Sequence, residues 1–280
     1  MIEDGTCSKM IDTEILRQKY SPDGSPLRNS QMKMLEVMML IDKICRDNHL
    51  VYFLSGGSAL GAERHNGFIP WDDDLDITLP KKDFNQLVSI LRELDSDRYV
   101  FQDRHTDFNY VNCFPKFREK EGNLLGSCPQ RGKLYKYKGV GVDIFCAAKN
   151  SFIRAFVCNK LKVALLHYTY LIKNDTLRKL VTKIQWGVYL FLVPLTWPLN
   201  VFRKKGEMHN DLGQGFPKQY LWEFDIFPVA VAPFENVMLP VPRNQDAYLT
   251  SVYGNWRQVP SDEEIAKAVH NSDFRSNKLK

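Results

Sequence analysis

Four of the five residues from 72 to 76 are aspartates, and the fifth is Leu75. Like charges this close repel one another, and burying any of them without a partner is costly. Residues 76–79 are predicted to form a strand that stops at Pro80, so Asp74 and Asp76 are expected on one face, roughly 6.5 Å apart along the chain. Two carboxylates placed in this way can share a hard cation such as Mg²⁺ or Mn²⁺, whereas a solvated acidic loop is the simpler interpretation.

A glycine turn precedes the acidic run. Residues 50–54 (LVYFL) form a short apolar segment typical of a buried strand, and Gly56, Gly57 and Ser58 follow it directly. A short helix is expected to begin at this turn and to end near Arg64. Glycines let a phosphate approach the backbone, and the N–H groups at a helix N-terminus favour an anion. The turn is a weak signal alone, but a turn followed by Asp-Leu-Asp on the next strand has the order of a nucleotidyltransferase fold, phosphate loop first and metal carboxylates second.

Residues 139–145 (GVGVDIF) alternate between apolar and other side chains, as a strand with one buried face does. The valines and the isoleucine then point one way, and Asp143 points the other way with Gly141 and Phe145. Asp143 is a natural third carboxylate for the same site. An aspartate that bonds a neighbouring loop is the alternative.

The remaining pattern mixes strands with helices and indicates an α/β or α+β fold. The first thirty residues are polar and turn-rich, and we expect them to be loosely ordered. Helical periodicity marks residues 31–48 and 84–94, and a third helix is expected over 245–253 with Gly254 after its end. Ser261 and Glu264 have the spacing of a capping box for a last helix.

Composition is that of an ordinary globular protein, with 44% hydrophobic and 25% charged residues. Its six cysteines include no C-x-x-C pair, and neither they nor the six histidines have zinc-site spacing, so reduced thiols are expected. The first twenty residues lack the apolar core of a signal peptide, which predicts a cytoplasmic site of action.

Positive charge is concentrated in the middle of the chain. Residues 152–205 contain ten lysines or arginines and one acid, in a chain whose net charge is +5. Within them, residues 186–202 carry no charge, include Trp186, Tyr189 and Trp197, and are interrupted by two prolines. This combination favours an anchor at an anionic membrane surface over a transmembrane helix, and a buried helix pair is the alternative. No recognised DNA- or RNA-binding module is present, so nucleic acid is not an expected partner.

The run over residues 57–77 (GSALGAERHNGFIPWDDDLDI) closely resembles the LicD family, which includes bacterial phosphocholine transferases and, more distantly, fukutin and fukutin-related protein. Two further stretches match the family pattern. They are GVDIF at 141–145 and a tail with FE at 234–235, LPVP at 239–242, YL at 248–249, YGNW at 253–256 and Pro260. The resemblance covers about 31–145 and 234–270 and is poor over 150–224.

The resemblance implies an α+β fold: a nucleotidyltransferase core, whose mixed sheet is flanked by helices, and a helical, basic and aromatic insertion. The implied division is a lead-in at 1–30, a catalytic core at 31–150, the insertion at 151–224, and a C-terminal part at 225–280 that completes the core.

The implied reaction moves phosphocholine or a polyol phosphate from a CDP-linked donor to a sugar hydroxyl of a cell-surface glycan, and CMP leaves. The acceptor is expected to be a glycan or lipid-linked glycan, which would place the enzyme at the inner leaflet of the cell membrane. Phosphoryl transfer needs positioning and charge neutralisation more than covalent chemistry.

The resemblance also implies roles for individual residues. Asp74 and Asp76 would hold the metal, and Asp143 would add a ligand or accept a proton. Several residues are candidates for binding the donor. Gly56, Gly57 and Ser58 form the glycine turn, and Arg64 would clamp the pyrophosphate. His65 and Trp71 would line the nucleotide pocket, and Lys116, on a predicted strand, would contact a phosphate. His270 falls where family members also carry a histidine.

Two other functions use the same acidic run. A nucleotidyltransferase that transfers the nucleoside monophosphate would share the metal site but release pyrophosphate instead of CMP. A calcium-binding module is suggested by Asp72-x-Asp74-x-Asp76, but an EF-hand loop needs glycine at its sixth position and glutamate at its twelfth. Those positions hold Ile77 and Asp83.

Overall fold

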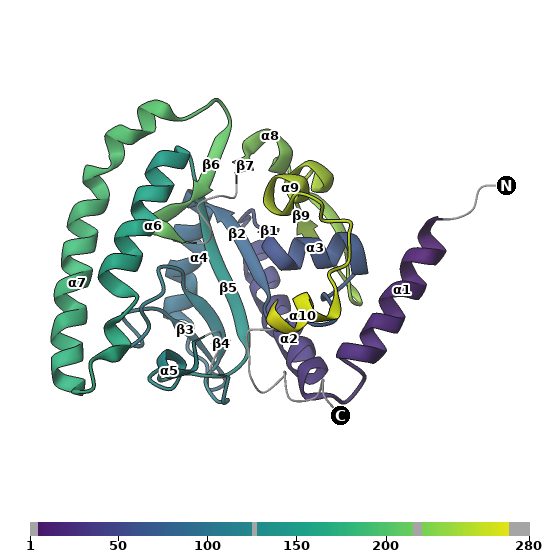
Figure 1. Cartoon of the computed structure of the whole chain (residues 1–280), viewed down its shortest axis with the longest axis horizontal. Helices are drawn as coiled ribbons and strands as arrows, with labels where there is room; N and C mark the ends of the chain where they lie inside the picture. Colours follow the sequence, from purple (N-terminus) through teal and green to yellow (C-terminus); the bar gives the residue numbers. More distant parts are fainter. Residues whose placement is uncertain (1–4, 125–127, 215–219, 269–280) are drawn as a thin grey trace.

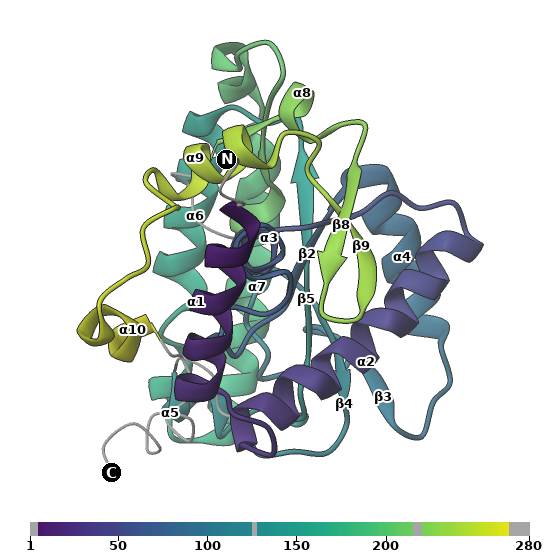
Figure 2. The ribbon, with the colours of Figure 1, turned by 90° about the vertical axis from the view of Figure 1, so that its right-hand side faces the viewer.

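A mixed β-sheet runs through the centre of the protein (Figures 1 and 2). The computed structural model describes residues 5–124, 128–214 and 220–268. Within them the main sheet has seven strands: β1 Phe53–Leu54, β2 Asp76–Pro80, β3 Tyr99–Gln102, β4 Lys116–Glu119, β5 Gly141–Ala148, β6 Glu207–Asn210 and β7 Leu221–Trp222. A separate hairpin pairs β8 (Ala230–Phe234) with β9 (Val237–Val241).

The order of the strands places the acidic run at 72–76 beside the strand that contains Asp143. Five strands follow the order β1-β2-β5-β4-β3, and β6 extends from the far end of β5 to β7. Strands β2 and β5 are parallel, whereas the other pairings among the described strands are antiparallel. Parallel neighbours need a crossover connection, which here contains α4, β3 and β4.

Helices cover both faces of the sheet. Helices α2 and α4 lie on one side of β2 and β5, and α6 and α7 lie on the other (Figure 2). The α-helices are α1 Gly5–Tyr20, α2 Pro26–Asp47, α3 Gly56–His65, α4 Lys81–Glu93, α5 Pro129–Gly132, α6 Phe152–Leu166, α7 Asp175–Leu195, α8 Glu223–Ile226, α9 Gln245–Tyr253 and α10 Asp262–Ala268. Three short 3₁₀ turns are η1 Thr169–Leu171, η2 Trp197–Phe202 and η3 Asp211–Gly213. This arrangement confirms the α+β prediction.

The N-terminal region differs from the prediction. Helix α1 occupies most of the segment that we expected to be loosely ordered, and α2 begins at Pro26 rather than near residue 31. The start of α2 has a physical cause: the Ser25 side chain accepts a hydrogen bond from the Arg28 N–H, and Pro26 suits the first helical position. The predicted apolar stripe of α2 is buried, with Met34, Met38, Ile41 and Cys45 at most 2% exposed.

Most of the other predicted elements are present with shifted ends. The apolar run at 50–54 contributes only the two-residue β1, while the strand at 76 extends through Pro80. Helix α9 spans the predicted residues, and Gly254 follows it with a φ of +69°. The capping box is formed, since Ser261 N–H donates to Glu264 Oε2 (2.8 Å) and Glu264 N–H donates to Ser261 Oγ (3.4 Å). The insertion is helical but also supplies β6 and β7 to the sheet.

Two helical glycines provide a matched test of the packing. A Cβ on Gly61 of α3 would lie 2.4 Å from the Gly67 carbonyl oxygen, whereas a Cβ on Gly187 of α7 would meet nothing within 4 Å. We expect Gly61→Ala to lower the free energy of unfolding by about 1–3 kcal/mol, as overpacking does. Gly187→Ala should raise it by up to about 1 kcal/mol through helix propensity. Urea unfolding measures the free energy of unfolding of both variants. If the two substitutions changed it equally, the close packing of Gly61 against the Gly67 carbonyl would be contradicted.

Candidate active site

The row of charged residues across β2, β5 and β4 results from strand register. Asp76 on β2 lies opposite Asp143 on β5, and Lys116 on β4 lies opposite Asp143 from the other side. The Lys116 ammonium forms an ion pair with Asp143 Oδ1. The Asp143 N–H donates to the Leu75 carbonyl (2.8 Å), which fixes the start of β2 against β5. Two aspartates separated by 67 positions in the sequence are therefore neighbours, with one lysine beside them.

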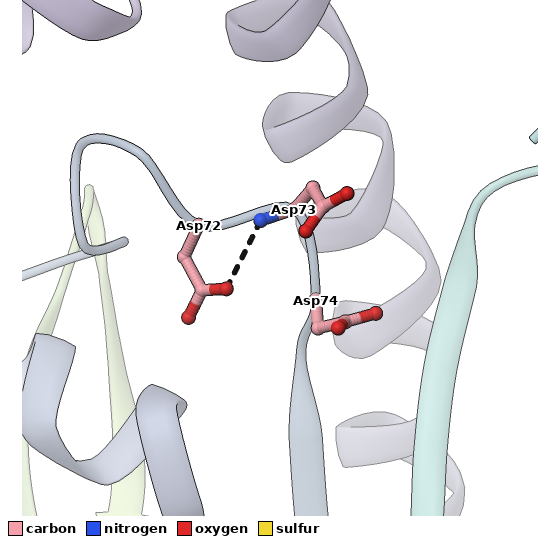
Figure 3. Close-up of side chains that lie close together, drawn as sticks. All are labelled: Asp72, Asp73 and Asp74. Carbon is pink, nitrogen blue, oxygen red and sulfur yellow. Dashed lines mark hydrogen bonds between the residues drawn. The ribbon is translucent and has the colours of Figure 1, made fainter. Parts of the chain in front are cut away.

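Three more carboxylates precede β2 directly. Asp72, Asp73 and Asp74 can each offer one oxygen to a cluster whose ligand atoms all lie within 4.8 Å of one another. Figure 3 shows their side chains fanned around the backbone just before the strand, with the Asp73 N–H donating to Asp72 Oδ1 (3.1 Å). The acidic run is thus a partly buried group that adjoins Asp76, and not only a solvated loop.

The glycine turn lies against this acidic group. Gly56 has a φ of +53°, and a Cβ there would be 3.1 Å from Asp76 Oδ2. A Cβ on Gly57 would be 2.6 Å from Asp72 Oδ2, which is closer than real Cβ contacts come. Side chains at these two positions would therefore collide with the carboxylates or come unusually close to them. The turn and the acidic run lie against each other, as their order in the sequence predicts.

Ser58 has a different place from the one expected of a phosphate-binding residue. Its Oγ accepts a hydrogen bond from the Asp76 N–H (2.8 Å), so it positions the start of β2. The Gly56 N–H donates to the Tyr248 hydroxyl (3.0 Å). The Tyr253 hydroxyl also lies near the turn, 3.7 Å from a Cβ placed on Gly56. Both tyrosines come from α9 and were not predicted as site residues, although they fall in the tail motif.

Burial and mutual repulsion raise the pKa values of two of these carboxylates. Burial raises the pKa of Asp76 well above its usual range, and Asp143, Asp74 and Asp72 raise it further. Burial also raises the pKa of Asp143 to about 6; Lys116 opposes this shift, and Asp74 adds to it. Burial opposes the protonation of Lys116, but Asp143 and Asp74 outweigh it, so the pKa of Lys116 lies above its usual value. Lys116 and Arg118 both oppose the upward shift of the Asp143 pKa, which burial nevertheless dominates.

A divalent cation fits this donor set. Carboxylate oxygens are the ligands that Mg²⁺ and Mn²⁺ prefer, and a doubly charged ion would offset the repulsion that raises these pKa values. The absence of side chains on the glycine turn lets the Asp72 and Asp76 carboxylates pack directly against its backbone. Asp74, Asp76 and Asp143 remain the predicted ligands, and the structure adds Asp72 as a fourth carboxylate. The EF-hand alternative has no support, because Asp76 to Pro80 form a strand and α4 follows.

Arg64, His65 and Trp71 lie together beside the acidic site and are held by protein groups. Arg64 Nη1 donates to the Trp256 carbonyl (3.0 Å), and Arg64 Nε donates to His65 Nε2 (2.9 Å). The other ring nitrogen of His65 lies 3.0 Å from the Thr13 hydroxyl of α1. Trp71 packs edge-on against both Tyr20 and His65. The roles predicted for these residues in binding the donor stay predictions. Their contacts in the structure connect α1 and the C-terminal tail to α3. His270 lies outside the described residues.

A mixed sheet with neighbouring carboxylates beside a glycine turn at a helix N-terminus is the arrangement expected of a nucleotidyltransferase fold. The family model for LicD/FKTN/FKRP, nucleotidyltransferase domain, matches residues 49–154, from the approach to β1 into α6. This range contains Asp74, Asp76, Lys116 and Asp143. The resemblance to the LicD family is confirmed, and these residues form its nucleotidyltransferase domain.

Comparison with curated proteins extends the similarity beyond this domain. The chain is 24% identical over 263 residues to lipopolysaccharide cholinephosphotransferase LicD of Haemophilus influenzae, covering 85% of this chain and 94% of that protein. It is 34% identical over 83 residues to an uncharacterized protein of Rickettsia prowazekii, covering 30% of each chain. A protein of Rickettsia typhi, also uncharacterized, is 36% identical over 88 residues, or 30% of this chain and 26% of that one. The similarity to the Haemophilus enzyme supports a transferase.

A thermal test addresses the cation without measuring activity. In chelator, Asp76→Asn should raise Tm above that of the wild type, because it removes a buried charge that its neighbours repel. Adding Mg²⁺ should raise Tm of the wild type by a few degrees, since a ligand that binds only the folded state stabilises it, and this increase should be lost in Asp76→Asn. The exposed Asp95 provides the control, and Asp95→Asn should respond like the wild type. An equal Mg²⁺ response in Asp76→Asn would remove Asp76 from the ligand set.

Proposed function

We propose that the chain transfers phosphocholine or a polyol phosphate from a CDP-linked donor to a sugar hydroxyl of a cell-surface glycan, releasing CMP, with Mg²⁺ or Mn²⁺ as cofactor. The carrying observation is that Asp72, Asp74 and Asp143 lie close enough to Asp76 to raise its pKa, and that Asp72 and Asp76 pack against the glycine turn inside the matched domain. The full-length similarity to an enzyme named as a lipopolysaccharide cholinephosphotransferase supports phosphocholine and a glycan as the first substrates to test.

In this proposal Asp74 and Asp76 hold the cation, with Asp72 beside them, and Asp143 either adds a ligand or accepts a proton. When bound, the ion would neutralise charge on the donor's pyrophosphate. The chain's own contribution is to position the donor. The turn at Gly56 and Gly57 has no side chains to keep a phosphate from its backbone, and the N-terminus of the ten-residue α3 favours an anion there.

The transfer itself replaces one phosphorus–oxygen bond by another. The acceptor oxygen attacks the phosphorus that carries the head group, the bond from that phosphorus to the bridging oxygen breaks, and CMP leaves with the electron pair. The hydroxyl proton must go to a base. Asp143 is the candidate, because a pKa of about 6 suits a group that accepts a proton near neutral pH. Lys116, paired with Asp143, would orient the carboxylate and bind a phosphate oxygen as the proton arrives.

Transfer of the nucleoside monophosphate is the second candidate function, since it needs the same carboxylates and glycine turn. The two reactions differ in their donor and therefore in the product. Head-group transfer from a CDP conjugate releases CMP, whereas transfer of the nucleoside monophosphate from a nucleoside triphosphate releases pyrophosphate.

The test is to incubate the purified protein with a lipopolysaccharide or teichoic acid acceptor and either CDP-choline or CDP-ribitol, measuring CMP, or a nucleoside triphosphate such as CTP or ATP, measuring pyrophosphate. We expect CMP release that stops in chelator and returns with Mg²⁺ or Mn²⁺. Asp74→Asn and Asp76→Asn should reduce release to background with the fold intact, because each removes a ligand and not core packing. Asp95→Asn is the matched control. Full activity in chelator would refute the metal requirement.

Asp143→Asn tests, in the same assay, whether Asp143 accepts the proton or binds the ion. It should lower kcat at least about 10²-fold if Asp143 accepts the proton or binds the ion directly. Lys116→Met keeps the carboxylate and removes its partner, so it should lower the rate and change the pH profile. A near-normal kcat for Asp143→Asn would reduce Asp143 to a structural residue.

A further inference from the structure

The outer face of α7 is an exposed apolar stripe. Its six members recur every three or four residues, and each is between 41 and 70% exposed: Leu177, Leu180, Ile184, Val188, Phe191 and Leu195. At 100° per residue they fall within about 80° of arc, over a length of about 27 Å. The 3₁₀ turn η2 continues the stripe with Trp197, Val201 and Phe202, each at least 60% exposed.

This stripe faces away from the rest of the protein. The opposite side of α7 is buried through Arg178, Thr182, Tyr189 and Val193. The last two belong to a small apolar cluster with Val111, Cys158 and Leu166. Figure 1 shows α7 along one edge of the molecule, with α6 between it and β5. The buried-pair alternative therefore accounts for the inner side of α7 and leaves its outer side unexplained.

The stripe is bordered by cations. Lys173 is exposed before it, Lys183 is exposed about 60° from its edge, and Lys204 and Lys205 are exposed directly after η2, whereas Lys179 is exposed on the other side of α7. Asp175 is the one acid between residues 152 and 205, and it pairs with Arg178 and Lys179. A helix with apolar and aromatic residues on one side and lysines beside them has the composition of one that lies in a membrane interface. No helix among the described residues is long and apolar enough to cross a membrane.

We infer that the outer stripe of α7, continued by η2, is a docking surface for an anionic lipid bilayer. The apolar side chains enter the boundary between headgroups and acyl chains, and the lysines contact anionic headgroups. Trp197 lies at the end of the stripe beside the cations, where tryptophan is enriched at membrane interfaces. The inference goes beyond the proposed reaction, because it assigns a function to a surface that the reaction does not use.

Charge favours a lipid surface over a second copy of the chain. An apolar stripe of this spacing could also pack against its own copy, as in a coiled coil. Such pairs are usually stabilised by opposite charges beside the stripe, and here the flanks of both copies would carry lysines with Asp175 as the one acid. The same lysines that repel a second copy attract anionic headgroups.

The experiment is co-sedimentation of the full chain with phosphatidylcholine vesicles that contain or lack phosphatidylglycerol, at low and high salt. Binding is expected to anionic vesicles at low salt, to weaken at high salt, and to be weak to neutral vesicles. Phe191→Gln with Leu195→Gln should weaken binding at least tenfold. The matched control is Val231→Gln with Met238→Gln, two equally exposed apolar residues on the β8–β9 hairpin, which should bind like the wild type.

A second variant addresses the charges. Arg203→Gln, Lys204→Gln and Lys205→Gln should remove most of the salt-sensitive part of the binding and leave CMP release from a soluble acceptor unchanged. Vesicle binding needs no donor or acceptor, so it can succeed where the proposed reaction fails, and the reverse also holds. Circular dichroism checks the fold of each variant, and the salt and lipid comparisons need no variant.

Three outcomes would overturn the inference. Wild-type protein that stays in the supernatant with anionic vesicles at low salt has no lipid-docking surface. Equal losses in the stripe and hairpin variants would mean that binding is not localised to α7. A dimer seen by light scattering that the stripe variant dissociates, without vesicle binding, would assign the stripe to a second copy.

Discussion

Repulsion among the aspartates at the start of β2 and Asp143 of β5 is the constraint that the surrounding structure must meet. Parallel pairing brings Asp76 and Asp143 together, and the raised pKa values of both show that the folded chain holds them at a cost. The protein opposes that cost with the Lys116 ammonium, with the charge of Arg118, and with N–H and hydroxyl contacts that hold the backbone in place. Carboxylates whose pKa values burial and mutual repulsion raise are suited to a ligand that brings positive charge.

The sequence predicted the parts of this site that come from local patterns, and not the contacts that distant strands and helices make with them. Alternation along 139–145 placed Asp143 on the face opposite the apolar residues, and the glycine turn could be located because it directly follows a short apolar run. Pairing of β4 with β5, which sets Lys116 against Asp143, depends on sheet order that no local pattern encodes. Tyr248 and Tyr253 come from a helix almost two hundred residues away. Their only signal was the tail motif.

The residues between the turn and the acidic run make contacts that no local pattern predicts. Arg64, His65 and Trp71 stand close to the site in sequence and have side chains that commonly bind nucleotides, which favoured a role in donor binding. In the structure their polar groups and ring faces contact Trp256, Thr13 and Tyr20. A buried guanidinium needs hydrogen-bond acceptors, and the tail supplies them. Proximity in sequence therefore placed Arg64, His65 and Trp71 beside the acidic site, but it did not show which protein groups they contact.

The basic middle is joined to the same sheet as the site. Strand β6, which follows η2, pairs with the end of β5 through Ala147 and Ala148, and Asp143 lies four residues earlier on that strand. Helix α6 leaves β5 at the same end and packs against α7. Contact of the outer stripe with a bilayer would therefore orient β5 through directly packed elements and not through a flexible linker. A transferase whose acceptor is attached to a lipid needs such an orientation, because the acceptor can approach from only one side.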